Sequence, residues 1–160
     1  MWEELEKVLK VITGYYEMLY VLNRKKRDVL GTLDFVKLKQ IVQKEDEIVG
    51  LISKTETKRQ QVLMDLAAAT EGLSPRMNSR DLYKFMPPEY KSRLAKCHDD
   101  LDKIVKKVQE LSENNKLLIS SALSAVNFHL NRIGGSVVEP TYGNRGQEVV
   151  SKEKKFDFKA

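Results

Sequence analysis

The sequence has a single cysteine, Cys97, among its 160 residues. One cysteine cannot form an intramolecular disulfide, so we expect the protein in a reducing compartment. Long apolar runs are also missing, since no uninterrupted apolar segment approaches the roughly 20 residues that a membrane-spanning helix needs. The N-terminal residues, MWEELEKVLK, lack the basic region and apolar core of a secretory signal. These absences predict a cytoplasmic protein without membrane insertion.

Motifs for catalysis and metal binding are missing as well. No Gly-rich loop follows a strand pattern, and no nucleophile elbow is present. The densest polar cluster is KCHDDLD, where His98 and Asp102 stand four residues apart on a predicted helix. Cys97 falls on the apolar seam of that helix whereas His98 and Asp102 point elsewhere, so the three cannot converge on one metal ion. We therefore expect no enzyme activity, no catalytic residues, no cofactor and no metal.

Charge of one sign is not in large excess. The 28 Lys and Arg residues against 23 Asp and Glu residues give a formal net charge of +5. The basic runs NRKKRD and TETKRQQ have acidic neighbours and no interleaved aromatic residues. A solvated helix face is therefore a better interpretation of both runs than a nucleic-acid site. A basic helical nucleic-acid-binding regulator stays open as the weakest alternative for function.

What the sequence does contain is three long stretches with apolar residues at alternating spacings of three and four, the pattern of bundle and coiled-coil helices. We expect helices over about residues 2–30 and residues 34–70, and a third long helix that Pro87 and Pro88 open and that ends at Arg132 to Gly134. Glycine at position 31 favours the end of the first helix. The second helix is expected to start with Thr32 or Asp34 as its cap.

Between the second and third helices, NSRDLYKFM is expected to form a short helix or turn capped by Asn78 or Ser79. No repeat and no β-alternation is present. The predicted fold class is therefore all-α, an antiparallel bundle of three long, coiled-coil-like helices with a short connecting helix. We expect the bundle domain over residues 1–134 and a flexible C-terminal tail over residues 135–160.

The end of the third helix, NKLLISSALSAVNFHLNRI, is apolar well beyond its seam, which continues through Leu118, Ala122, Ala125 and His129. A helix that is apolar nearly all round has to be covered on more than one side. Cover by the connecting segment, by the first helical hairpin or by a homodimer mate is one alternative, so a monomer and a homodimer both stay open. The other is a docking surface for a partner helix, and we assign to it Leu117, Leu118, Leu123, Phe128 and Leu130.

Two polar residues fall on the seam of the third helix. Asn115 is interpreted as a residue that fixes the register of packing at some cost in stability. His129 is interpreted as a core histidine rather than a base.

The C-terminal segment PTYGNRGQEVVSKEKKFDFKA combines glycine, proline and charge, which together oppose ordered packing. A solvated terminus is the plain interpretation. Tyr142, Phe156 and Phe158 are nevertheless the residues in it most able to anchor a partner, because aromatic side chains bring large contact area at low entropy cost.

Three segments carry a family resemblance: the hairpin NRKKRDVLGTLDFVKLKQIVQKEDEIVGLISKTETKRQQVLMDLA, the helical stretch NNKLLISSALSAVNFHLNRI, and PTYGNRG with a terminal KA. In this order they resemble the FlgN-like flagellar export chaperones over nearly the whole chain. The resemblance implies a small cytoplasmic helical protein that holds hook-associated, hook-filament junction proteins before type III secretion. It also implies that Tyr142 contacts the flagellar export gate. A self-associating coiled-coil adaptor is the alternative from the structural class.

Overall fold

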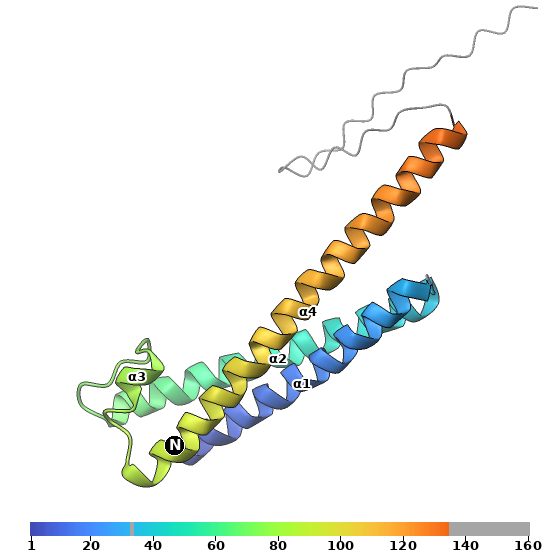
Figure 1. Cartoon of the computed structure of the whole chain (residues 1–160). Coiled ribbons are helices and arrows are strands. Elements are labelled where there is room, and N and C mark those ends of the chain that lie inside the picture. The colour runs from blue at the N-terminus through green and yellow to red at the C-terminus, as the bar shows by residue number, and fades with distance from the viewer. Residues whose placement is uncertain (33, 135–160) are drawn as a thin grey trace, which may run out of the picture. The chain divides into compact units, whose positions relative to one another are not determined.

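The computed structural model describes residues 1–32 and 34–134, and it places four helices in them (Figure 1). These are α1 (Trp2–Thr32), α2 (Phe35–Ala69), α3 (Ser79–Leu82) and α4 (Pro88–Gly134). This part of the chain contains no strand, which confirms the predicted all-α fold. The chain divides into two compact units, residues 1–115 and residues 116–160.

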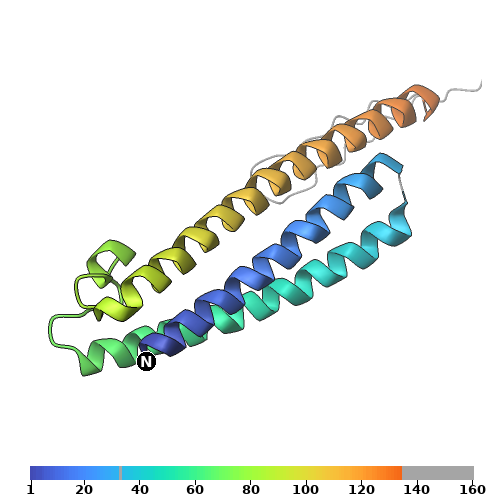
Figure 2. The same cartoon turned by 60° about the horizontal axis from the view of Figure 1, so that its bottom comes forward.

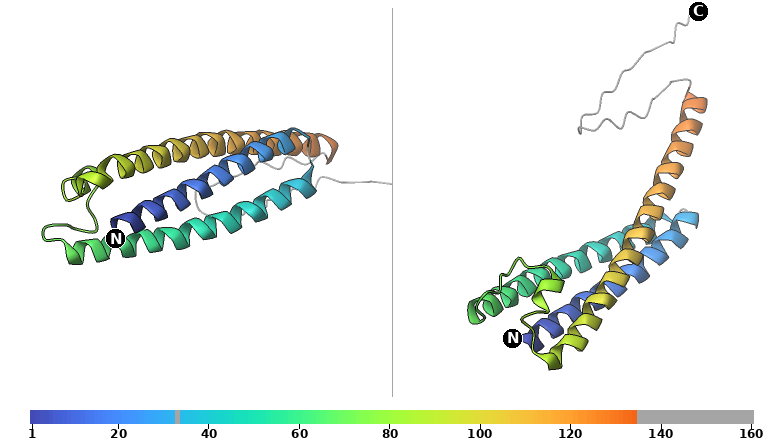
Figure 3. Two further views of the ribbon diagram at one scale, coloured as in Figure 1. Left: turned by 90° about the horizontal axis from the view of Figure 1, so that it is seen from below. Right: turned by 60° about the vertical axis from the view of Figure 1, so that its left-hand side comes forward.

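In the first unit the long helices alternate in direction. Helices α1 and α2 run side by side in opposite directions (Figure 2). The part of α4 up to Asn115 returns antiparallel to α2, and the short α3 lies beside the start of α4 (Figure 3). Short connections between successive helices make this up-down-up order the expected one for a bundle.

The starts of two helices match the caps that the sequence predicts. The side chain of Asp34 accepts a hydrogen bond from the backbone N–H of Lys37 at 3.0 Å. Asn78 does the same for Asp81 at 2.9 Å and so caps α3. Each of these bonds satisfies a backbone donor that has no partner within its own helix.

The predicted end of α1 is wrong by about one half turn. The helix continues through Gly31 to Thr32, whose hydroxyl donates a hydrogen bond to the Val29 carbonyl at 3.0 Å. Glycine permits a helix to end but does not force it to, since one glycine in a helix costs only about 1 kcal/mol. Gly72, after α2, is different, because its φ of 79° is the left-handed conformation that glycine adopts without strain.

Two apolar clusters form the core of residues 1–115. The larger one joins the start of α1, the end of α2, the α3 segment and the start of α4. Its buried members are Leu5, Leu9, Val62, Leu63, Leu66, Leu73, Leu82, Met86, Leu94 and Cys97. The smaller one lies midway along the helices and contains Leu19, Ile48, Ile52 and Val108. Leu82 and Met86 are thus both buried in this first unit, where they pack the α3 segment against the three long helices.

Candidate functional site

The buried seam of α4 ends at Asn115, which is only 2% exposed. Its Nδ2 donates hydrogen bonds to the Asn23 carbonyl at 2.8 Å and to the Asn23 side-chain oxygen at 3.3 Å. Asn23 in turn donates from its own Nδ2 to the Leu19 carbonyl at 3.1 Å. A polar pair inside an apolar seam favours the one alignment in which its hydrogen bonds form. Asn115 therefore fixes how α4 lies along α1 in this unit.

Beyond Asn115, α4 contains a stretch without charge. No charged residue occurs between Lys116 and Arg132. All five residues that the sequence predicts as a docking surface lie here, with exposed fractions from 43% at Leu118 to 66% at Leu117. Val126 and Ile133 are also exposed, Ile133 by 85%, although neither was predicted as part of the surface. From residue 116 to residue 133 no side chain of α4 is buried.

The apolar residues of this stretch form a continuous line along one side of the helix. At about 100° per residue, positions spaced four, three, four and three apart stay within roughly 80° of one another. We call this line the apolar stripe, and it consists of Ile119, Leu123, Val126, Leu130 and Ile133. Leu118 flanks the stripe, whereas Leu117 and Phe128 lie on roughly the opposite side of the helix. The predicted residues are therefore exposed together but do not form one face.

The sequence pattern could have identified the rest of the stripe. Ile119, Val126 and Ile133 were missed because the predicted seam runs through Leu118, Ala122 and Ala125 with the same spacing, one residue earlier. The interpretation of His129 on that seam as a core residue is wrong. His129 is exposed, and its ring meets that of Phe128 edge-on at 5.7 Å. The seam of α4 thus has no buried member after Asn115 within the described residues.

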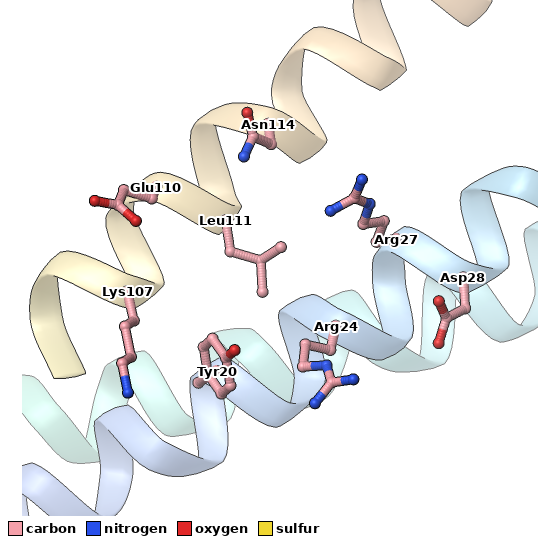
Figure 4. Close-up of a pocket in the computed structure, with 8 residues that line it drawn as sticks. All are labelled: Tyr20, Arg24, Arg27, Asp28, Lys107, Glu110, Leu111 and Asn114. Carbon is pink, nitrogen blue, oxygen red and sulfur yellow. The ribbon is translucent and has the colours of Figure 1, made fainter.

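A second feature is a groove of about 620 Å³ between α1 and α4 within residues 1–115 (Figure 4). Leu111 points from α4 toward α1 above Tyr20, so these two form an apolar floor. The groove is lined from α1 by Tyr20, Arg24, Arg27 and Asp28, and from α4 by Lys107, Glu110, Leu111 and Asn114.

The basic run NRKKRD is largely a solvated helix face, as the sequence predicts, because Arg24, Lys25, Arg27 and Asp28 are exposed. Lys26 is only 16% exposed at its side chain and forms a salt bridge with Glu45 of α2. Arg24 and Arg27 instead line the α1–α4 groove. One turn of helix distributes four successive side chains around the axis, so Lys26 faces α2 while the charged residues beside it stay exposed.

The KCHDDLD cluster attaches α3 to α4. The Tyr83 hydroxyl and Nδ1 of His98 are joined by a hydrogen bond of 2.8 Å, and the two rings meet edge-on. Burial, and then the nearby Arg59, lower the pKa of His98, which favours the neutral form of its imidazole. Burial raises the pKa of the Cys97 thiol. In the described part of the chain no three side chains of the metal-binding types are grouped as a metal site would require.

The predicted tail residues Tyr142, Phe156 and Phe158 lie outside the described residues. Among the helices that the structure does describe, none has the length and apolarity needed to cross a membrane.

Comparison with known proteins gives one match. The sequence model of the family FlgN, described as FlgN protein, matches residues 1–149. No curated protein and no solved structure matches the chain.

Proposed function

Because the chain belongs to the FlgN family, a family of flagellar export chaperones, we propose that it binds the terminal helices of hook-associated proteins and delivers them to the flagellar export gate. The proposed binding site is the charge-free stretch of α4. It includes the predicted residues Leu117, Leu118, Leu123, Phe128 and Leu130, and now also the remainder of the apolar stripe.

The observation that carries this proposal is that no residue of the apolar stripe is buried and that four of its five residues are exposed. Exposed apolar residues that adjoin one another on a surface mark an interaction site, because water disfavours them. Full burial of one Leu, Ile, Val or Phe side chain contributes about 1.5–3 kcal/mol. A partner helix packed along the stripe would therefore bury enough apolar area to bind, and the spacing of the stripe is that of helix-to-helix packing.

Mechanistically, binding of this kind needs no nucleotide and no cofactor. The terminal helices of the hook-associated protein would otherwise expose their own apolar faces and polymerise. Covering them with α4 keeps them soluble in the cytoplasm until export. Tyr142 is proposed to contact the export gate, and Phe156 and Phe158 are proposed as further anchors in the tail.

Calorimetry with the hook-associated proteins of the same organism tests the proposal. Leu123→Asp changes the apolar stripe and Phe128→Asp changes the opposite side, so comparing them locates the binding face. Ser120→Asp is the matched control, because Ser120 lies on the polar strip between the two faces. Burying an unpaired carboxylate in the interface should weaken binding at least about 100-fold, whereas the control stays within about twofold.

Two outcomes would contradict the proposal. One is saturable binding that neither Leu123→Asp nor Phe128→Asp weakens, and the other is no binding to any hook-associated protein. Circular dichroism of each variant checks that its helices are retained, which is expected because both positions are exposed.

The spacing of the apolar stripe also favours a second candidate, a self-associating coiled-coil adaptor. In that case the stripe would be buried between two copies of the chain. Light scattering separates the two candidates. A tight dimer that Leu123→Asp dissociates, combined with no affinity for any hook-associated protein, supports the adaptor.

A further inference from the structure

The α1–α4 groove contains three cations that form no salt bridge within residues 1–32 and 34–134, namely Arg24, Arg27 and Lys107. Two other basic residues of the same unit are paired. Lys26 pairs with Glu45, and Arg93 reaches Glu6 at 2.6 Å. The three groove cations come from two different helices but line one hollow, so their positive potential is concentrated there.

The groove is also lined by apolar and acidic groups. Its floor is formed by the partly buried side chains of Tyr20 and Leu111 (Figure 4). Asp28 and Glu110 lie among the lining residues, and within the described chain neither carboxylate forms a salt bridge. The groove thus offers apolar contact at its floor and a positive charge excess around it.

The dimensions of the groove suit a short piece of polypeptide. From Tyr20 to Asp28 the α1 wall rises by roughly 12 Å, which is about two turns of helix. A volume of about 620 Å³ accommodates several side chains but is open along its length rather than closed around a small ligand.

We infer that this groove binds an acidic amphipathic segment of the partner protein. Carboxylates of the segment pair with Arg24, Arg27 and Lys107, and an apolar side chain between them packs on Tyr20 and Leu111. The inference rests on the proposed function, because the segment belongs to the same hook-associated protein whose terminal helix α4 binds. It adds a second contact, of opposite chemistry, to the apolar one.

A peptide fits the groove better than a nucleic acid does. A phosphate backbone carries negative charge at every step and would meet repulsion from Asp28 and Glu110. A peptide can place its carboxylates beside the three cations and a polar or basic side chain beside the two acids. The apolar floor favours the same occupant, because the groove shows only one aromatic ring for bases to stack on.

The test is binding of the hook-associated protein to a charge-reversal variant, Arg27→Glu with Lys107→Glu, measured by calorimetry. The matched control is Lys39→Glu with Lys106→Glu, which makes the same charge change at exposed positions outside the groove, again on two helices. We expect the groove variant to weaken binding about tenfold or more at low salt and the control to stay within about twofold. Near 0.5 M salt the difference should largely disappear, since exposed charges are screened over about 4 Å there.

A neutral variant, Arg27→Gln with Lys107→Gln, should lose an intermediate amount of binding affinity if charge is the cause. It also provides a second measurement in case the charge-reversal variant does not fold. Equal binding by the groove variant and the wild type would overturn the inference and leave the proposed function standing. No binding by the wild type would overturn both. Salt-dependent binding of single-stranded RNA that the groove variant loses, with hook-associated protein binding unchanged, would overturn the inference in favour of a nucleic-acid site.

Discussion

At the scale of single residues, the buried pair Asn23 and Asn115 is the most specific contact in the first unit. The pair joins α1 to α4 through hydrogen bonds that exist in only one alignment of the two helices. Apolar residues around it contribute stability without distinguishing one alignment from the next, because they are interchangeable along the seam. The pair therefore contributes more to selecting a single alignment of α1 and α4 than to the free energy of unfolding.

Replacing Asn115 separates these two contributions. Asn115→Ala removes the hydrogen bonds and leaves a cavity, which we expect to lower the free energy of unfolding by about 1–3 kcal/mol. Asn115→Leu keeps the volume and should cost less, or even stabilise, while permitting more than one alignment. Urea unfolding measures the energies, and duplicated amide peaks in an NMR spectrum reveal mixed alignment. A leucine variant as unstable as the alanine variant would contradict this account.

His98 predicts a pH dependence of stability. Because burial lowers the pKa of His98 in the folded protein below its ordinary value of 6.5, protonation favours the unfolded chain. The stability associated with the neutral ring is present above about pH 6.5 and decreases as pH falls through the lower, folded pKa. Arg59 acts in the same direction as burial, and Asp102 opposes it.

Urea unfolding at about pH 7.5 and about pH 5.5 checks this expectation. The wild type should be less stable at the lower pH, and His98→Gln should reduce that difference. Tyr83→Phe serves as a comparison, since it removes the hydrogen bond to Nδ1 but keeps the titrating ring. The same pH difference in His98→Gln as in the wild type would show that other groups cause it.

At the scale of the helices, two glycines predict opposite effects of the same substitution. Gly50 lies inside α2, and a Cβ there would have no atom within 4 Å. Gly50→Ala should raise the free energy of unfolding by about 0.5–1 kcal/mol, because alanine favours helix. Gly72 has a φ of 79°, and its Cβ would stand 3.4 Å from the Phe85 ring.

Gly72→Ala should therefore lower the free energy of unfolding by about 1 kcal/mol or more. Thermal unfolding of both variants beside the wild type measures the two signs in one experiment. Equal shifts in the same direction would mean that the backbone conformation at these positions does not decide the outcome.

The helices show what could and could not be predicted from the sequence. Asp34 and Asn78 were identifiable as caps because a cap depends on local chemistry alone. The inward direction of Lys26 was not identifiable, because it depends on Glu45 in another helix. The apolar stripe was missed in part because two lines of equal spacing run along α4, and periodicity does not say which of them is covered.

At the scale of the whole molecule, the division into compact units falls after Asn115, inside α4. No turn and no glycine marks that position in the sequence, so composition could not reveal it. The expected division into a domain over residues 1–134 and a tail over residues 135–160 follows the end of the helix instead, and it remains a prediction.

A shortened chain tests the independence of the first unit. Every buried residue of the described chain lies at or before Asn115. A protein ending at Ser120 should therefore unfold at nearly the same urea concentration as the full chain while losing affinity for hook-associated proteins. Unfolding followed by circular dichroism, together with calorimetry, measures both. A large loss of stability, or full affinity in the shortened chain, would contradict the separation of folding from binding along α4.

The charge-free stretch of α4 has a practical consequence for proteolysis. Trypsin cleaves after lysine and arginine, and between Lys116 and Arg132 it finds neither. Digestion therefore releases this stretch uncut, as the fragment of residues 117–132, which carries four of the five residues of the apolar stripe. Mass spectrometry can follow that fragment in a mixture, so the delay in its release when a candidate partner is added reports occupancy of the site without any label.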